Sequence, residues 1–266
     1  MPAFQLSEDQ LAFMDTFGYL HLPGLLSDRI DRVTAAFEEL MTSRGGAEHD
    51  GASRFCVVPG LNHNAYLCTL LDDDRIAGTA ASLLGDDYQY WNSDANYYTG
   101  DTRWHSDTSW PPPIRFFKFA IYLDPMTRDG GALRVIPGSH RAGEPYAEIV
   151  HRELNGDSPW GGIHGRDVPA EALETQPGDV AVFNHATKHS AWGGSDRRRM
   201  FTMVFTERHT GESLHHFREV IRKHGYSKRD VFGDPGGPLL GTAAPERKRH
   251  LEQLWEQIPD DAPEPA

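Results

Sequence analysis

Side chains that could hold a metal ion lie close together near the middle of this chain. His105-Ser106-Asp107 places an imidazole and a carboxylate two residues apart, and residues at this spacing on a β-strand project from the same face. With one further imidazole the pair would complete a two-histidine, one-carboxylate set, which suits iron(II) and leaves three coordination positions open. The pair alone is weak evidence, since about one His-x-Asp is expected by chance in a chain of this length.

Further imidazoles and a group of arginines follow in the second half of the chain. The apolar run at 180–183 leads into His185 and His189, and three arginines at 197–199 precede the next β-type run. Either histidine could supply the missing metal ligand. Because the planar guanidinium group matches a carboxylate bidentately, an arginine here could bind the distal carboxylate of an α-keto diacid.

The surrounding segments predict a mainly β core with flanking helices. Ser7 and Gln10 form a capping-box pattern, and a helix is expected from about Asp74 to Leu84, ending at Gly85. Short β-type runs separated by turn residues then predict an antiparallel sandwich or barrel. We therefore expect one domain over 1–266, with a helical N-terminal part at about 1–85, a β core at about 88–206 and a helical tail at about 207–256.

Composition narrows the classes of partner. A net charge of −13 argues against nucleic acid or an anionic membrane as the main partner. No apolar run approaches the roughly 20 residues that span a bilayer, and the N-terminus lacks the pattern of a signal peptide, so we expect a cytoplasmic protein. A local excess of Lys and Arg from Arg197 to His250 favours an anionic or polar small-molecule substrate, and either a monomer or a homodimer fits.

Longer motifs make the chain resemble the phytanoyl-CoA dioxygenase family of iron(II)- and 2-oxoglutarate-dependent oxygenases. The resemblance is carried by LSEDQLAFMDTFGYLHLPGLLSDRIDRV, WHSD, DGGALRVIPGSHR and PGDVAVFNHATKHSAWGGSDRRR, and it extends to RRRMFTMVF. It implies a double-stranded β-helix (jelly-roll, cupin-like) core with the N-terminal helices packed on one sheet. It also implies iron(II), 2-oxoglutarate and dioxygen as cofactor and co-substrates, and hydroxylation of an unactivated C–H with release of succinate and CO₂.

The resemblance also assigns roles to residues. It makes His105, Asp107 and His189 the catalytic iron ligands, and it makes Arg198 the residue that binds 2-oxoglutarate. Arg199 is the second candidate for that role. Many family members have a lysine on the strand before the His-x-Asp motif. This chain has Tyr98 and Thr99 there, and either hydroxyl could bind 2-oxoglutarate.

Three further residues are candidates for the substrate pocket, namely Trp192, Trp110 and His185, and ordinary packing would explain each of them equally well. The site itself also fits other functions. A non-catalytic cupin-like protein or a zinc hydrolase could use the same ligands. Desaturation or cyclisation could use the same iron site as hydroxylation.

Overall fold

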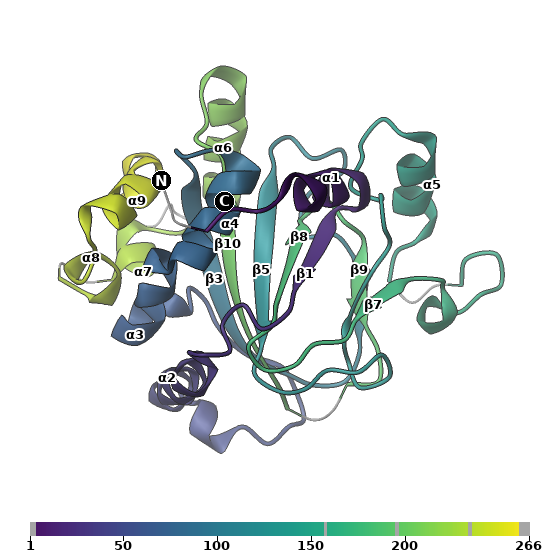
Figure 1. The fold of residues 1–266 in the computed structure, drawn as a ribbon, viewed down its shortest axis with the longest axis horizontal. Helices are drawn as coiled ribbons and strands as arrows, with labels where there is room; N and C mark the ends of the chain where they lie inside the picture. The colour runs from purple at the N-terminus through teal and green to yellow at the C-terminus, as the bar shows by residue number, and fades with distance from the viewer. Residues whose placement is uncertain (1–3, 157–158, 195–196, 234–235, 261–266) are drawn as a thin grey trace.

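Two antiparallel sheets packed face to face form the centre of the computed structural model, which describes residues 4–156, 159–194, 197–233 and 236–260 (Figure 1). The larger sheet has the strand order β1-β8-β5-β10-β3-β2, and the smaller has the order β4-β9-β6-β7. The strands are β1 Tyr19–Leu22, β2 Phe55–Val57, β3 Gln89–Tyr98, β4 Thr102–His105, β5 Phe116–Tyr122, β6 Leu133–Val135, β7 Glu171–Leu173, β8 Val180–Asn184, β9 His189–Ala191 and β10 Arg198–Thr206.

The alternation of side chains on β5 shows how the sequence separates two cores. Phe119 and Ile121 belong to the larger hydrophobic core, which lies under the helices. Ala120 and Tyr122, on the opposite face of the strand, pack in a second core together with Leu133 of the smaller sheet. Because successive residues of a strand point to opposite faces, β5 separates the helix-covered side of its sheet from the space between the sheets.

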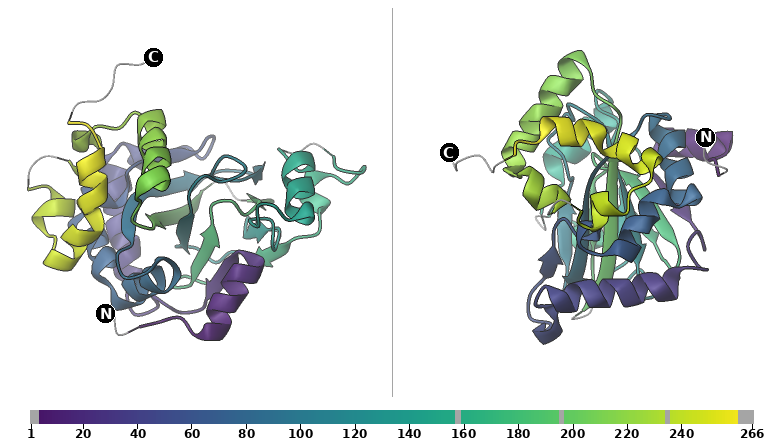
Figure 2. Two further views of the ribbon diagram at one scale, coloured as in Figure 1. Left: turned by 90° about the horizontal axis from the view of Figure 1, so that it is seen from above. Right: turned by 90° about the vertical axis from the view of Figure 1, so that its left-hand side faces the viewer.

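Helices cover the outer face of the larger sheet (Figures 1 and 2). As predicted, helices from the N-terminal part pack there, and helices from the C-terminal tail share the same core. The capping box of Ser7 with Gln10 and the helix from Asp74 to Leu84 are both confirmed. The helices are α1 Glu8–Phe17, α2 Ile30–Ser43, α3 Ala65–Cys68, α4 Asp74–Leu84, α5 Pro145–Glu153, α6 Gly211–His224, α7 Lys228–Phe232, α8 Pro238–Gly241 and α9 Pro245–Gln257.

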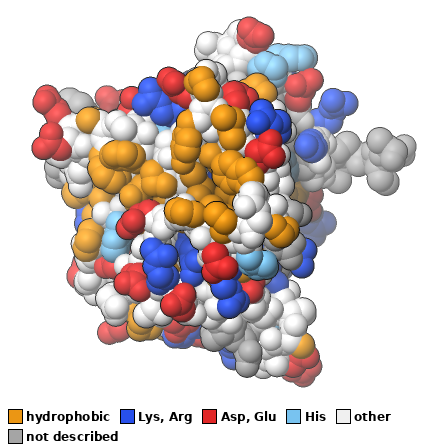
Figure 3. Space-filling model, turned by 90° about the vertical axis from the view of Figure 1, so that its right-hand side faces the viewer, with side chains coloured by type: hydrophobic (Ala, Val, Ile, Leu, Met, Phe, Trp, Pro, Cys, Tyr) orange, Lys and Arg blue, Asp and Glu red, His pale blue; other side chains and the backbone are white. Residues whose placement is uncertain are grey.

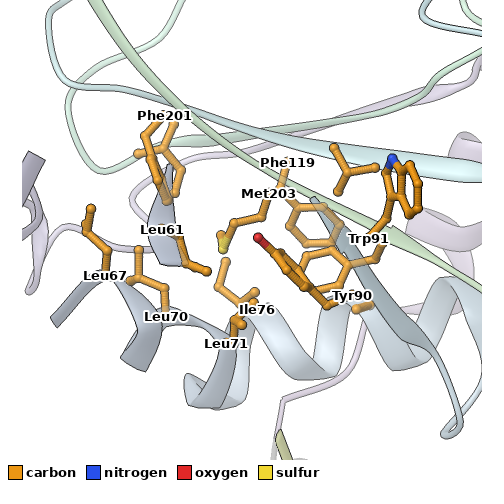
Figure 4. Packing of buried hydrophobic residues seen from close by; sticks show 14 of the residues in the cluster. Leu61, Leu67, Leu70, Leu71, Ile76, Tyr90, Trp91, Phe119, Phe201 and Met203 are labelled. Carbon is orange, nitrogen blue, oxygen red and sulfur yellow. The ribbon is translucent and has the colours of Figure 1, made fainter. Parts of the chain in front are cut away.

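Large apolar side chains fill the space between these helices and the sheet (Figure 4). Ile76 of α4 and Phe119 of β5 are fully buried. Tyr90 of β3 is buried as well, and its hydroxyl donates to Asn62 Oδ1 at 2.8 Å. Truncation of a large residue in such a core costs about 3–5 kcal/mol of stability, so this packing holds the sheet, and with it the side chains on its inner face.

The outer face of the smaller sheet is covered by α5 and nearby loop residues. Trp104 of β4 and Val150 of α5 pack in a third, smaller core. Tyr146 and Ile149 on the other side of α5 are exposed, and Figure 3 shows hydrophobic side chains gathered on the face of the molecule that is on the right in Figure 1, where α5 lies.

Some elements differ from the prediction. One strand of ten residues, β3, is present where short β-type runs were expected, because the chain continues straight through Ser93 and Asp94. The strands β2 and β7 and the helix α5 were not predicted. No helix in the described part of the chain has the length and apolar character needed to cross a bilayer.

Candidate active site

Two histidines meet where β4 and β9 pair. His105 is the last residue of β4 and lies opposite His189, the first residue of β9, with ring centroids 4.1 Å apart. Asp107 follows just after β4, so the pair is at a strand end and not inside one strand as predicted. The backbone N–H of Asp107 donates to the carbonyl of His185 at 2.9 Å. One potential ligand atom from each of His105, Asp107 and His189 lies within 4.8 Å of the others.

Hydrogen bonds orient both imidazole rings in the same way. Nδ1 of His105 lies 2.7 Å from the carbonyl oxygen of Arg103, and Nδ1 of His189 lies 2.9 Å from that of Thr187. Since a carbonyl only accepts hydrogen bonds, each Nδ1 must carry the proton. The lone pair of each ring is then on Nε2, the usual arrangement of a metal-binding histidine.

Burial and nearby charges prepare these groups for a cation. Burial lowers the pKa of His189 to about 3, which keeps the ring neutral. Burial alone would raise the pKa of Asp107, but the ammonium group of Lys118 outweighs it and holds that pKa well below its usual range. The site therefore presents two imidazoles whose Nε2 atoms are turned to accept a metal and an ionised carboxylate, the donor set that fits iron(II).

A cavity of about 60 Å³ leads from these ligands into the space between the sheets. His105, Asp107 and His189 line one part of it, and Arg198 lines another. Its remaining lining side chains combine hydroxyl groups with apolar surface, as in Tyr98, Thr102, Tyr122, Leu133 and Met200.

Arg198 is a buried cation, with 3% of its surface exposed. It donates from Nη1 to the carbonyl of Gly131 at 2.6 Å and from Nη2 to that of Gly100 at 2.7 Å, while Nε has no hydrogen-bond partner among the described residues. Burial lowers the pKa of this guanidinium group. Among the described residues no carboxylate forms an ion pair with Arg198, so the cavity holds a positive charge that an anionic ligand could neutralise.

Glycines make room for this guanidinium group. Gly131 has φ +88°, and a Cβ there would lie 2.5 Å from Arg198 Nη1. A Cβ on Gly194 would lie 2.5 Å from Arg198 Nε. The glycines of the DGGALRV and AWGG motifs thus allow the backbone to approach the arginine closely.

The other residues predicted to bind 2-oxoglutarate divide between the two faces of the sheet. Tyr98 lines the cavity, and the guanidinium carbon of Arg198 lies 5.6 Å from the centre of its ring. Arg199 faces the other way and forms ion pairs with Asp124 and Glu38. The side chain of Thr99, just after β3, is not part of the cavity lining. Arg199 thus lies on the opposite face of β10 from Arg198, outside the cavity.

The predicted substrate-pocket residues are outside this cavity. Trp192 is buried in the small core beside α5. Trp110 stacks on His151 of α5, with ring centroids 3.5 Å apart. His185 is nearer to the metal ligands: its Nε2 lies 4.0 Å from Asp107 Oδ2 and has no hydrogen-bond partner among the described residues. Both tryptophans thus pack against other side chains outside the cavity, whereas His185 lies next to the predicted metal ligands.

Among the cavity residues that sequence reasoning missed are Lys118 and Tyr122 of β5. Lys118 Nζ lies 2.8 Å from Asp107 Oδ2. Burial raises the pKa of Tyr122 to about 12, so its phenol stays protonated. The signal for Lys118 was present in FFKFAIY, where it is the one charged residue in a run that otherwise reads as a buried strand.

Two imidazoles and one carboxylate at the end of a cavity in a sandwich of antiparallel sheets define the class of non-haem iron oxygenase sites. The family model described as "Phytanoyl-CoA dioxygenase (PhyH)" matches residues 14–201. The chain belongs to this family. The predicted membership in a family of iron(II)- and 2-oxoglutarate-dependent oxygenases is thus confirmed.

Relatives and solved structures agree with this family. An ectoine dioxygenase of Sphingopyxis alaskensis is 36% identical over 157 residues, which are 51% of this chain and 50% of the relative. The chain thus spans about half the length of the curated relatives that it matches. The structure resembles HygX of Streptomyces hygroscopicus with nickel and 2-oxoglutarate bound (TM-score 0.62, 18% identity, 79% of this chain and 90% of that one). It also resembles EctD of S. alaskensis with 2-oxoglutarate and 5-hydroxyectoine (TM-score 0.59, 24% identity, 78% of each chain). These likenesses confirm the predicted jelly-roll fold.

Proposed function

We propose that this protein is an iron(II)- and 2-oxoglutarate-dependent dioxygenase that hydroxylates an unactivated C–H of a small-molecule metabolite. His105, Asp107 and His189 hold the iron, and Arg198 binds the distal carboxylate of 2-oxoglutarate. The observation that carries the proposal is the shared cavity, in which a buried guanidinium group without a carboxylate partner among the described residues faces the same space as the three ligands. A cation and a metal position in one cavity suit a ligand with a carboxylate at each end.

When bound, iron(II) and 2-oxoglutarate supply the activation of dioxygen, coupled to the decarboxylation of the co-substrate to succinate. The chain binds the metal and the co-substrate, orients the substrate and excludes water from the cavity. Nε2 of His105 and of His189 and one oxygen of Asp107 are the ligand atoms. Arg198, fixed by two backbone carbonyls, presents its remaining N–H donors to the co-substrate, and the side chain of Tyr98 lines the same cavity.

The proposed substrate is a polar small molecule. Support comes from the inner face of the larger sheet, where β3 carries polar side chains and the charge of Asp94 acts on Lys118 of the cavity. Asp94 and Asn96 of β3 are hydrogen-bonded to each other at 2.9 Å, and Arg54 Nε donates to Asn96 Oδ1 at 2.7 Å. A wall of this kind offers hydrogen bonds and charges to a substrate. Desaturation and cyclisation remain alternative outcomes on the same iron site.

Succinate formation tests the proposal. Purified protein is incubated with iron(II), ascorbate and 2-oxoglutarate in air, alone and with a panel of polar metabolites, and succinate is quantified. We expect succinate that depends on iron and on dioxygen and that rises with one class of metabolite, together with a product heavier by one oxygen atom. Absence of succinate under all conditions, despite bound metal, would favour a cupin-like protein without catalytic activity.

A further inference from the structure

Lys118 contacts the carboxylate of the proposed iron site directly. It lies on β5 with 15% of its side chain exposed, and its Nζ is 2.8 Å from Asp107 Oδ2. Its neighbours on the strand, Phe117 and Phe119, are buried in the core under the helices. An ammonium group in this position is costly to bury unless it is paired, so its location depends on the carboxylate that it contacts.

A second carboxylate flanks Lys118 on the inner face of the sheet. Burial alone would lower the pKa of Lys118, but the negative charges of Asp107 and Asp94 outweigh it and raise that pKa. Asp94 is itself fixed, since the hydroxyl of Thr202 donates to its Oδ1 at 2.5 Å and the amide of Asn96 donates to the same oxygen at 2.9 Å. Lys118 is therefore paired with the predicted metal ligand, and the charge of the fixed Asp94 carboxylate further stabilises its ammonium form.

The two oxygens of Asp107 have different surroundings as a result. Oδ2 accepts from Lys118 at 2.8 Å and lies 3.6 Å from Nε2 of His189. Oδ1 lies 3.8 Å from Nε2 of His105 and has no hydrogen-bond donor among the described residues. A carboxylate can bind a metal ion with one oxygen or with both. Because the ammonium group beside Oδ2 takes one of its lone pairs and repels a metal cation, Oδ1 is the oxygen better placed to bind the metal.

We propose that Lys118 is a positioning residue that restricts Asp107 to metal binding through Oδ1 alone. This inference rests on the proposed function, in which the iron must keep open positions for 2-oxoglutarate and dioxygen. A carboxylate that bound through both oxygens would occupy one of those positions. Lys118 thus acts on co-substrate binding through Asp107 and does so by donating a hydrogen bond to it.

Three substitutions separate this role from a purely electrostatic one. Lys118→Arg keeps both the donor and the charge, Lys118→Gln keeps a donor without the charge, and Lys118→Met removes both. Lys188→Met is the matched control. Lys188 is also a buried lysine, but it is hydrogen-bonded to Asn155 at 2.8 Å and does not line the cavity. Near-ultraviolet circular dichroism and thermal unfolding of each apo-protein establish that it is folded.

Two anaerobic titrations are then made on each variant. In the first, iron(II) alone is added and its binding is measured by calorimetry. In the second, 2-oxoglutarate is added to the iron-loaded protein and the visible metal-to-ligand charge-transfer band is followed. We expect Lys118→Met to bind iron(II) at least as tightly as the wild type, because a repelling cation has been removed, but to bind 2-oxoglutarate about 10- to 100-fold more weakly, the usual effect of losing a partner of a metal ligand.

The glutamine and arginine variants decide between the explanations. We expect both to bind 2-oxoglutarate nearly as well as the wild type and the Lys188→Met control. If Lys118→Gln is as weak as Lys118→Met, the charge and not the hydrogen bond is responsible, and the positioning role is refuted. Unchanged 2-oxoglutarate binding by Lys118→Met also refutes it. By contrast, a wild type that binds iron(II) but forms no band contradicts the proposed function itself, so the two failures are distinguishable.

Discussion

Replacement of Arg198 with methionine removes the buried cation of the cavity while keeping a side chain of similar length. The guanidinium group is 3% exposed and donates to the carbonyls of Gly131 and Gly100. In the apo-protein the loss of these hydrogen bonds costs about 1–3 kcal/mol for a buried carbonyl. The removal of a desolvated charge offsets part of this cost. We therefore expect a modest change in the stability of the apo-protein.

The expected effect on 2-oxoglutarate binding is much larger. Removal of one partner of a buried, hydrogen-bonded charge pair costs about 2–5 kcal/mol, which corresponds to a roughly 30-fold to several-thousand-fold rise in Kd. At a ligand concentration about 100 times Kd, binding stabilises the wild type by about 2.7 kcal/mol. For a protein of this size that raises Tm by about 5–10 °C. A 100-fold rise in Kd reduces the stabilisation to about 0.4 kcal/mol, or about 1 °C.

Thermal unfolding of the metal-loaded protein with and without 2-oxoglutarate measures this difference. Arg199→Met is the matched control, because Arg199 is the next residue of β10 but forms ion pairs with Asp124 and Glu38 outside the cavity. We expect Arg199→Met to keep the full 2-oxoglutarate-dependent shift and Arg198→Met to lose nearly all of it. A shift retained by Arg198→Met and lost by Arg199→Met would refute the assignment.

Three further predictions concern the cavity and the helix beside it. Gly131→Ala places a Cβ against Arg198 Nη1, so we expect weaker 2-oxoglutarate binding in the same thermal-shift assay with the iron(II) affinity unchanged. Tyr98→Phe removes one hydroxyl from the cavity wall and should weaken 2-oxoglutarate binding by about 0.5–1.5 kcal/mol, and an unchanged Kd would exclude the hydroxyl as a ligand. Burial lowers the pKa of His151 from 6.5 to about 4. The stability that comes from its neutral ring is therefore present above pH 6.5 and is lost as the pH falls towards 4. Tm measured against pH should fall less steeply over this range in His151→Gln.

Local patterns predicted much of the fold. The capping box at Ser7 and the helix that ends at Gly85 were readable because caps and helix stops depend on neighbouring residues. The long apolar runs that became β5, β8 and β10 were readable for the same reason. By contrast, β7 and β9 have three residues each and depend on pairing with distant strands, which leaves little local signal.

The site was predictable where residue types carry the chemistry. His105 and Asp107 were found from their types and spacing, the family resemblance selected His189 over His185, and the structure brings the three together. The two arginines differ only in which face of β10 they occupy, and that register is fixed by pairing with β3 and β5. Lys118 was missed because its role comes from contact with Asp107 across the cavity, and a single charged residue in an apolar strand does not reveal its partner.

An anaerobic titration of the apo-protein with iron(II) and then 2-oxoglutarate tests the central claim most directly, because it reports the metal and the co-substrate in one signal. The account predicts a visible metal-to-ligand charge-transfer band in the wild type that weakens strongly in both Asp107→Ala and Arg198→Ala. Asp107→Ala should lose the band because it lacks one of the iron ligands. Arg198→Ala should lose it because it binds 2-oxoglutarate weakly, although it still binds iron(II). A wild-type protein that binds iron(II) but gives no band with 2-oxoglutarate would contradict the account.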